Sequence, residues 1–342
     1  MKINPANERI KHRYFTYLRE TKSIGEHAID EVAKALDRFE EHTGRRAFRE
    51  YRTEQAISFK KHLAKLNAQR GGQRLSKATV TSTLHALRGF FLWLAEQRSF
   101  RRIQRTDADY FRPSRNDEAI ARARCQTPVP TVEQIRTVLA AMPDATAVNR
   151  RDRALVALIM LTGARDDAVA SARLKHLDLA ERQLFQDPRE MRTKFRKTIS
   201  TWFFPVGDDF AAIVTEWKTE LVSIHGFGPD DPLFPKTAVS FGSDGDVLAP
   251  GLGRECWANA DPIRKVFKVA CAAAGLPYFN PHSLRHTLAQ LAGSRCTTAE
   301  QYKAWSQNLG HKDVLTTLTS YGTVPDYRQR DLIRSMGVIA GE

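Results

Sequence analysis

The chain has 342 residues, a length that suggests two domains, and no apolar run approaches the roughly 20 residues that a membrane span needs. Hydrophobic residues make up 42% and charged residues 27%, as in ordinary globular proteins with a packed core. The N-terminus shows no apolar signal segment, and the four cysteines include no C-x-x-C pair, so we expect neither secretion nor a disulfide or zinc scaffold. These features predict a cytoplasmic protein without membrane contact.

An excess of basic residues gives the first indication of a partner. Lys and Arg number 53 against 39 Asp and Glu, a formal charge of +14 with an isoelectric point near 9.8. Residues 1–127 hold 27 basic and 15 acidic residues, whereas residues 128–342 hold 26 and 24. A basic segment gains affinity for nucleic acid because each phosphate that it neutralises releases condensed counterions. The charge of residues 1–127 therefore favours nucleic acid as the partner. Charge alone leaves an anionic membrane, or solubility without a partner, as alternatives.

The N-terminal part is predicted to be helical. Apolar residues at helical spacing predict three helices, over residues 26–42, from a cap at Thr53 to about residue 66, and from a cap at Ser76 to about residue 94. Gly44 lies where the first of them would end. The third helix carries an aromatic cluster that we expect in the core rather than as a base-stacking surface: Phe90, Phe91 and Trp93.

After residue 100 the pattern breaks into a polar, basic stretch that is closed by two prolines, which predicts an interdomain linker. Thr131 and Gln134 then form a capping box that opens a second domain. That domain is predicted to be mainly helical, with one short antiparallel strand pair between residues 184 and 206. The fold class is therefore mainly α with a mixed α/β second domain, and the expected division is 1–112, 113–129 (linker) and 130–342.

Two segments of the second domain carry basic residues at turns. In Thr162-Gly163-Ala164-Arg165, the glycine ends an apolar helix, and Arg165 lies near the N-terminal N–H groups of the next helix, which favour anions. The turn of the expected hairpin holds Lys194 and Lys197. Taken singly, each segment is more typical of a solvated surface than of a site.

Two further segments point more sharply to phosphate chemistry. His282, Arg285 and His286 share one helical face by their i, i+3, i+4 spacing. A fixed guanidinium repels metal ions but binds phosphate with two N–H groups, and neutral histidine can accept a proton near pH 7, so no metal site is expected here. A structural histidine pair stays an alternative. The last segment is Leu309-Gly310-His311, followed by Tyr321 in a polar setting.

In combination, these segments resemble the tyrosine recombinase (phage integrase) family, which is marked by T-G-x-R, a hairpin lysine, H-x-x-R-H, L-G-H and a C-terminal tyrosine in that order. The resemblance covers the whole chain, because the family's core-binding domain is a basic helical unit like residues 1–112. It implies a site-specific recombinase or integrase that cuts and rejoins DNA without a cofactor. The implied catalytic residues are Arg165, Lys194, His282, Arg285, His311 and Tyr321, with His286 in support.

The resemblance also implies a role for each group. Tyr321 attacks a phosphodiester and forms a 3′-phosphotyrosyl bond, with His282 as the candidate general base. The two arginines stabilise the phosphorane, and His311 adds a hydrogen bond. Lys194 protonates the leaving 5′-oxygen, although hairpin register leaves Lys197 as an alternative.

Double-stranded DNA recombination sites are the implied partner, with a tetramer assembled on DNA in the bacterial nucleoid and possible accessory DNA-bending factors. An amphipathic helix near residues 331–339 would dock either on a neighbouring protomer or on its own domain. Two rival functions stay open, a type IB topoisomerase-like relaxation and a DNA-binding accessory protein with an inactive site.

Two positions depart from the family pattern. Many members place the tyrosine nine residues after the Gly-His histidine, whereas Tyr321 follows His311 by ten. One extra residue would rotate a helical side chain by about 100°. Family members also often carry an acidic residue three positions after the first arginine, where this chain has Ala168, with Asp167 one position earlier.

Overall fold

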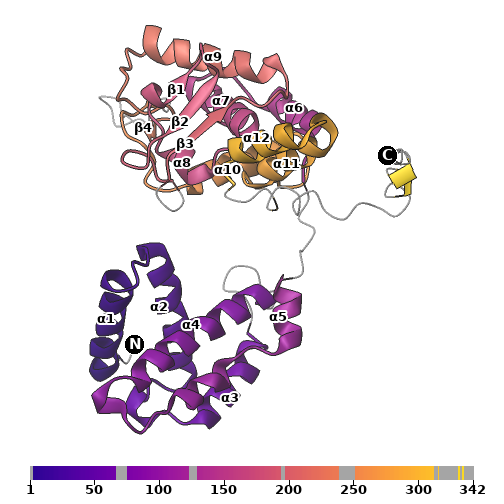
Figure 1. Cartoon of the computed structure of the whole chain (residues 1–342). Coiled ribbons are helices and arrows are strands. Elements are labelled where there is room, and N and C mark those ends of the chain that lie inside the picture. Colours follow the sequence, from indigo (N-terminus) through magenta and orange to yellow (C-terminus); the bar gives the residue numbers. More distant parts are fainter. Residues whose placement is uncertain are drawn as a thin grey trace, which may run out of the picture. The chain divides into compact units, whose positions relative to one another are not determined.

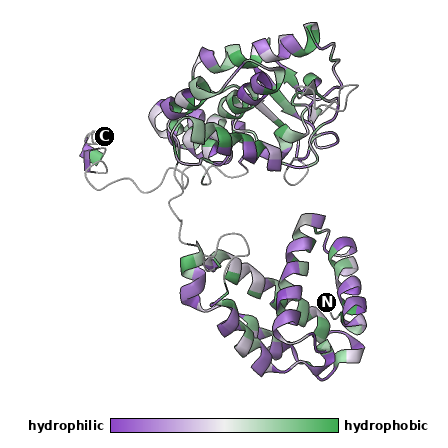
Figure 2. Ribbon diagram, turned by 180° about the vertical axis from the view of Figure 1, so that it is seen from behind, coloured by the Kyte–Doolittle hydropathy of each residue, from purple (hydrophilic) through white to green (hydrophobic). Residues whose placement is uncertain are grey.

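The computed structural model describes residues 3–66, 75–122, 129–193, 197–238 and 251–311, and five positions beyond them: Leu315, Arg330, Asp331, Ile333 and Arg334. The chain forms two compact units, Met1–Gln126 and Thr127–Glu342 (Figure 1). In each unit the helices turn hydrophobic faces inward and hydrophilic faces outward (Figure 2). Each unit is therefore built around a core of its own.

The first unit is helical throughout its described part. Its α-helices are α1 (Pro5–Glu20), α2 (Glu26–His42), α3 (Thr53–Leu63), α4 (Lys77–Ala95) and α5 (Arg115–Arg122), joined by the 3-10 turns η1 (Phe48–Glu50), η2 (Arg98–Phe100) and η3 (Arg105–Phe111). Helix α2 has the predicted bounds, and Gly44 follows it with a φ of +66°. Ser76 caps α4 as predicted, accepting a hydrogen bond from the Thr79 N–H at 3.1 Å.

Three features of this unit differ from the sequence prediction. Helix α1 was not predicted, although Asn4 caps it and Pro5 stands in its first turn. Thr53 is the first helical residue of α3, and the position before it takes an extended backbone, so Thr53 is not the cap. Helix α5 lies inside the stretch expected as a linker, where Ser114 accepts a hydrogen bond from the Asp117 N–H and starts a turn.

Aromatic side chains fill the core of the first unit. Phe39 of α2 makes edge-to-face contacts with Phe59, Phe91 and Phe111, with ring centroids 5.3–5.5 Å apart. Phe90, Phe91 and Trp93 are buried, which confirms that the aromatic cluster of α4 is a core feature. Edge-to-face pairs of this kind stabilise beyond the area that they bury, by about 0.5–1.5 kcal/mol each.

A buried polar cluster joins α1 to α2. The Glu40 carboxylate is fully buried and accepts hydrogen bonds from Asn7 Nδ2 at 2.8 Å and Lys11 Nζ at 2.7 Å. Burial alone would lower the pKa of Lys11, but hydrogen bonds to Glu40 and Glu8 outweigh it and raise that pKa. Asn7 also accepts from the Phe48 N–H, so one cluster fixes three segments of the unit.

The second unit holds the remaining helices and both sheets. Its helices are α6 (Val132–Ala141), α7 (Ala147–Thr162), α8 (Asp166–Ala170), η4 (Leu174–His176), α9 (Asp208–Ser223), α10 (Asp261–Ala273), α11 (Ser283–Arg295) and α12 (Ala299–Asn308). Thr131 and Gln134 make the predicted capping box at the start of α6. Helix α7 is the central element, since every side chain from Ala154 to Leu161 is buried and α6, α9, α10 and α11 all pack on it.

The three-stranded antiparallel sheet has the order β1 (Leu177–Asp178), β2 (Gln183–Gln186), β3 (Ile199–Trp202). The predicted strand pair is confirmed as β2 and β3, which pair from Gln183 opposite Trp202 to Gln186 opposite Ile199. A second, two-stranded sheet of β4 (Thr237–Ala238) and β5 (Gly251–Leu252) was not predicted. Lys194 and Lys197, which are expected at a hairpin turn, lie between β2 and β3 in the sequence, and residues 194–196 fall outside the described residues.

The described residues include no helix that is both long and apolar enough to span a membrane. The C-terminal tail, for which the sequence predicted a helix near residues 331–339, falls mostly outside the described residues.

The buried Glu40 cluster generates a stability prediction. Glu40→Ala should lower the free energy of opening of α1 and α2 by about 2–3 kcal/mol, because it removes the buried carboxylate and leaves Lys11 with only the partly exposed Glu8 as a counter-ion. The matched control is Lys34→Ala, which removes an exposed i, i+3 pair with Glu31 and should cost less than about 0.5 kcal/mol. Hydrogen exchange of the helix amides in the full-length chain measures both, and equal losses would contradict the prediction.

Candidate active site

A left-handed glycine at the end of α7 sets the geometry of the site. Gly163 has a φ of +58° and donates its N–H to the Ile159 carbonyl at 2.8 Å, which closes the helix. A Cβ at this position would lie 2.9 Å from Leu288 Cδ1 and 3.0 Å from Leu309 Cδ2. Only glycine allows α11 and the Leu309 turn to approach α7 this closely.

Arg285 of α11 joins three of the segments that the sequence singled out. Its side chain is 5% exposed, and its two terminal nitrogens donate to the carbonyl oxygens of Gly163 and Leu309. Burial, and then repulsion from Arg165, lowers the pKa of Arg285 to about 9. This pKa is still above 7, so the guanidinium is positive at neutral pH. The two carbonyl groups accept its hydrogen bonds but carry no net charge, so they do not neutralise it.

Arg165 stands directly before helix α8, beside this buried cation. Its extended backbone ends the Gly163 turn, and its side chain is half-buried, which lowers the pKa of the guanidinium. Among the described residues, no carboxylate forms an ion pair with either Arg165 or Arg285. Two adjacent cations without a carboxylate partner make a strong attractor for an anion.

Three histidines surround the two arginines. His282 and His286 of the α11 N-terminus meet edge to face, with ring centroids 5.2 Å apart. Part of the His282 surface is exposed, yet desolvation by the protein atoms around its ring, followed by the charge of Arg285, lowers the pKa of His282 to about 4. Desolvation and the same two arginines lower the pKa of His311 to about 4. Both rings are therefore neutral near pH 7 and able to accept a proton.

The turn that carries His311 is fastened to strand β3. Asn308 at the end of α12 accepts a hydrogen bond from the Trp202 N–H and donates one to the Trp202 carbonyl, both at 2.8 Å. Gly310 follows with a φ of +68°, and a Cβ there would lie 3.2 Å from Ile199 Cδ1. The side-chain amide of Asn308 thus pairs with the Trp202 backbone as the backbone of a neighbouring strand would.

The structure brings together five of the expected site residues from separate segments of the second unit: Arg165, Arg285, His282, His286 and His311. The expected nucleophile Tyr321 and the expected general acid Lys194 lie outside the described residues. Lys197 is described and exposed. No cluster of three or more metal-ligating His, Cys, Asp or Glu side chains occurs among the residues that the structure describes.

The surroundings of Asp167 and Ala168 explain one departure from the family pattern, the alanine at a position where members often carry an acidic residue. Ala168 is buried against the core of the unit, where a carboxylate would be unsolvated. Asp167 is half-exposed instead, and its Oδ1 accepts a hydrogen bond from Arg192 Nε at 2.8 Å. Sequence reasoning missed both Arg192 and Asn308, because their partners are a distant side chain and a distant backbone that no local pattern reveals.

Comparison with known proteins identifies the family of the chain. The sequence profile described as the phage integrase family matches residues 129–326, more than half of the chain. The chain belongs to the phage integrase family. No curated protein matches its sequence.

Solved structures of similar fold cover nearly the whole chain. The Tn1549 transposon integrase in complex with a circular intermediate DNA aligns with a TM-score of 0.62 and 13% identity, over 95% of this chain and 99% of that one. A lambda integrase dimer bound to a COC′ core site gives 0.58 and 14%, over 93% and 97%. The XerH recombinase bound to a difH substrate, a pre-cleavage complex, gives 0.54 and 17%, over 96% and 84%. At these identities the likeness shows a shared fold.

Crowding at Gly163 leads to a second prediction. Gly163→Ala should destabilise the second unit by about 2–4 kcal/mol, because it adds an overpacked methyl to a backbone that β-carbons disfavour. Gly275→Ala is the matched control, since its φ is +68° but nothing lies within 4 Å of an added Cβ, and it should cost only about 1 kcal/mol. Urea unfolding followed by tryptophan fluorescence measures the difference, and equal costs would show that crowding is unimportant.

The depressed pKa of His311 predicts an acid-sensitive fold. Between about pH 6.5 and 4 the unfolded histidine binds a proton that the folded one does not, so the free energy of unfolding falls as pH falls. In His311→Gln this loss should be smaller by roughly 1–3 kcal/mol. The measured quantity is the change in unfolding free energy between pH 7.5 and pH 4.5, in which the packing cost of the substitution cancels. Identical changes in both proteins would contradict the prediction.

Proposed function

We propose that this phage integrase family member is a site-specific DNA recombinase that breaks and rejoins strands through Tyr321. The observation that carries the proposal is the pair Arg165 and Arg285, two adjacent guanidinium groups without a carboxylate partner in the described part of the chain. Such a pair suits a phosphodiester, and best of all the phosphorane into which it is converted, because that species carries more negative charge.

The cleavage step follows from the groups around this pair. The Tyr321 hydroxyl attacks the scissile phosphorus, and its proton passes to the neutral ring of His282. The bond from phosphorus to the 5′-oxygen breaks, and a lysine of the β2–β3 connection donates a proton to that oxygen. His311 and the two arginines hold the non-bridging oxygens, while His286 supports the His282 ring through its edge-to-face contact. Lys194 is the proposed acid, and Lys197 stays the alternative.

The reverse reaction completes the exchange. A 5′-hydroxyl from a partner strand attacks the 3′-phosphotyrosyl bond and releases Tyr321, so the phosphodiester energy is conserved. No nucleotide or organic cofactor is needed for this sequence of steps.

DNA recombination sites are the proposed substrate and partner. The N-terminal unit, with its large excess of Lys and Arg, would contact the DNA backbone and position the catalytic unit on a duplex. The titles of the lambda integrase and XerH structures describe complexes with a core site and with a difH substrate. We extend this to assembly as a tetramer on paired sites of a mobile element in the bacterial nucleoid, with accessory DNA-bending factors as further partners.

The two rival functions are not favoured. The solved structures reported above are recombinases or integrases by their titles. A topoisomerase-like relaxation differs only in which 5′-hydroxyl attacks the phosphotyrosine, so strand exchange between two labelled sites separates it from recombination.

Covalent trapping tests the proposed nucleophile. The substrate is a nicked duplex that carries the site selected by the full-length protein from a random pool. Wild type should form a protein–DNA adduct that survives SDS, and Tyr321→Phe should form none, because it lacks the attacking oxygen. Tyr327→Phe is the control and should trap as wild type does. An adduct that persists in Tyr321→Phe would move the nucleophile elsewhere, and bound DNA without any adduct would favour an inactive binding protein.

A further inference from the structure

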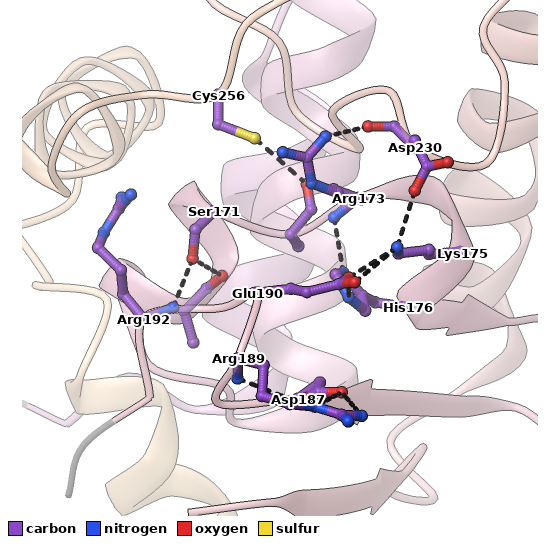
Figure 3. A network of polar contacts seen from close by, with 12 residues as sticks. Ser171, Arg173, Lys175, His176, Asp187, Arg189, Glu190, Arg192, Asp230 and Cys256 are labelled. Atoms are coloured by element: carbon purple, nitrogen blue, oxygen red, sulfur yellow. Dashed lines mark hydrogen bonds and ion pairs between the residues drawn. The ribbon is translucent and has the colours of Figure 1, made fainter. Parts of the chain in front are cut away.

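The chain that leads to Lys194 is held in place up to two residues before it. After β2, the backbone N–H groups of Glu190 and Met191 donate to the Asp187 carbonyl, and Met191 is buried. Glu190 receives hydrogen bonds from Lys175 at 2.8 Å and from His176 at 3.0 Å, and Asp230 binds Lys175 from the other side (Figure 3). The first half of the β2–β3 connection is therefore a fixed part of the fold.

Arg192 ends this fixed part and is bound at three points. Its backbone N–H donates to Ser171 Oγ at 2.9 Å, a contact visible in Figure 3. Its side chain donates from Nε to Asp167 Oδ1 at 2.8 Å and from Nη2 to the Trp257 carbonyl at 2.9 Å. Asp167 lies in α8, and Ser171 caps the C-terminus of that helix.

Helix α8 is the element that Arg165 opens. Arg192 is thus attached to the same five-residue helix that positions one of the two phosphate-binding arginines. Lys194 follows Arg192 by two positions in the sequence, so this attachment fixes the point from which the chain leads to that lysine.

The strand that follows the connection is attached to the turn that carries His311. Ile199, where the connection enters β3, lies against Gly310, and Asn308 is hydrogen bonded to both backbone groups of Trp202 at the far end of β3. The connection that carries Lys194 and Lys197 therefore starts from the Arg165 element and ends at the His311 turn. Neither attachment includes a group that would itself touch the reacting phosphate.

We propose that Arg192, held by Asp167, is a positioning residue for the lysine that protonates the leaving 5′-oxygen. This inference rests on the proposed recombinase function and deepens it. The pair is partly exposed, with 38% of the Arg192 side chain and 49% of the Asp167 side chain accessible, so it contributes little to global stability. Its effect is on geometry, because proton transfer needs the lysine within hydrogen-bond reach of the 5′-oxygen.

A substrate that needs no general acid tests the proposal. In a duplex whose scissile 5′-bridging oxygen is replaced by sulfur, the phosphorus–sulfur bond breaks and sulfur leaves as a thiolate, which requires no proton. Arg192→Ala and Asp167→Asn should slow covalent cleavage of the ordinary oxygen substrate about ten-fold or more. On the sulfur substrate both variants should cleave within about two-fold of wild type, because only the acid step is impaired.

The matched control is Asp208→Asn. It removes the carboxylate from another exposed pair, with Arg182 at 3.0 Å, beside the end of the β2–β3 ladder away from the connection. This variant should cleave both substrates as wild type does. In a Lys194→Ala background, Arg192→Ala should add less than a two-fold loss on the oxygen substrate, since a positioning residue has nothing left to position. If Lys197 is the acid, the same non-additivity appears in a Lys197→Ala background instead.

Three outcomes would overturn the proposal. Equal losses on the oxygen and sulfur substrates would mean that the pair acts through Arg165 or through general stability, which the midpoint of thermal unfolding reports separately. Full activity of both variants on the oxygen substrate would show that the pair has no catalytic effect. Wild type that binds the DNA but forms no adduct with either substrate would overturn the proposed function itself, and the positioning role with it.

Discussion

The site depends on one buried cation, Arg285, that no carboxylate in the described part of the chain neutralises. Arg285 donates hydrogen bonds to the carbonyl groups of Gly163 and Leu309. These contacts join α7, α11 and the turn after α12 to one another. Burying a charge without a counter-ion is costly, as the lowered pKa of Arg285 reflects. The apolar second half of α7, from Ala154 to Leu161, offsets that cost, since it supplies a packed core that holds the arginine in place. No carboxylate among the described residues completes the electrostatics, and the proposed phosphodiester substrate would do so.

The same charge sets the protonation of the histidines. Desolvation and the two arginines keep His282 and His311 neutral, so each can accept a proton or share one. A bound phosphodiester would reduce the positive potential and raise both pKa values toward neutral pH, where proton transfer from a tyrosine is most effective. In the proposed mechanism the arginines would act in two ways: they attract the phosphate, and until it binds they keep the histidine rings unprotonated, so that a base is available.

Local patterns in the sequence predicted much of this arrangement, and the contacts that they could not predict are long-range. Helix α2, the cap at Ser76, the box at Thr131 and the antiparallel strand pair follow from spacing and capping chemistry within a few residues. The grouping of Arg165, Arg285 and His311 required the family resemblance, because their segments are far apart in the chain. The roles of Asp167 and Asn308 had no local signal, since each depends on a partner that folding brings from elsewhere. The one-residue displacement of the acidic position reflects burial: Ala168 faces the core, and Asp167 faces the β2–β3 connection.

The contacts that stabilise the fold are stronger than the contacts that position the segments of the site. The Glu40 cluster and the apolar α7 are buried, so their loss is felt as lost stability. The contacts of Arg192 and Asn308 are exposed or partly buried, and each is worth little in water. Arg192 lies near the start of one short connection, whereas Asn308 holds the far end of the strand that follows it, and the two contacts join these segments to α8 and to the His311 turn. A weak contact at such a place cannot hold the domain together, but it can decide which of several nearby positions a lysine takes, and a proton transfer is sensitive to displacements of about 1 Å.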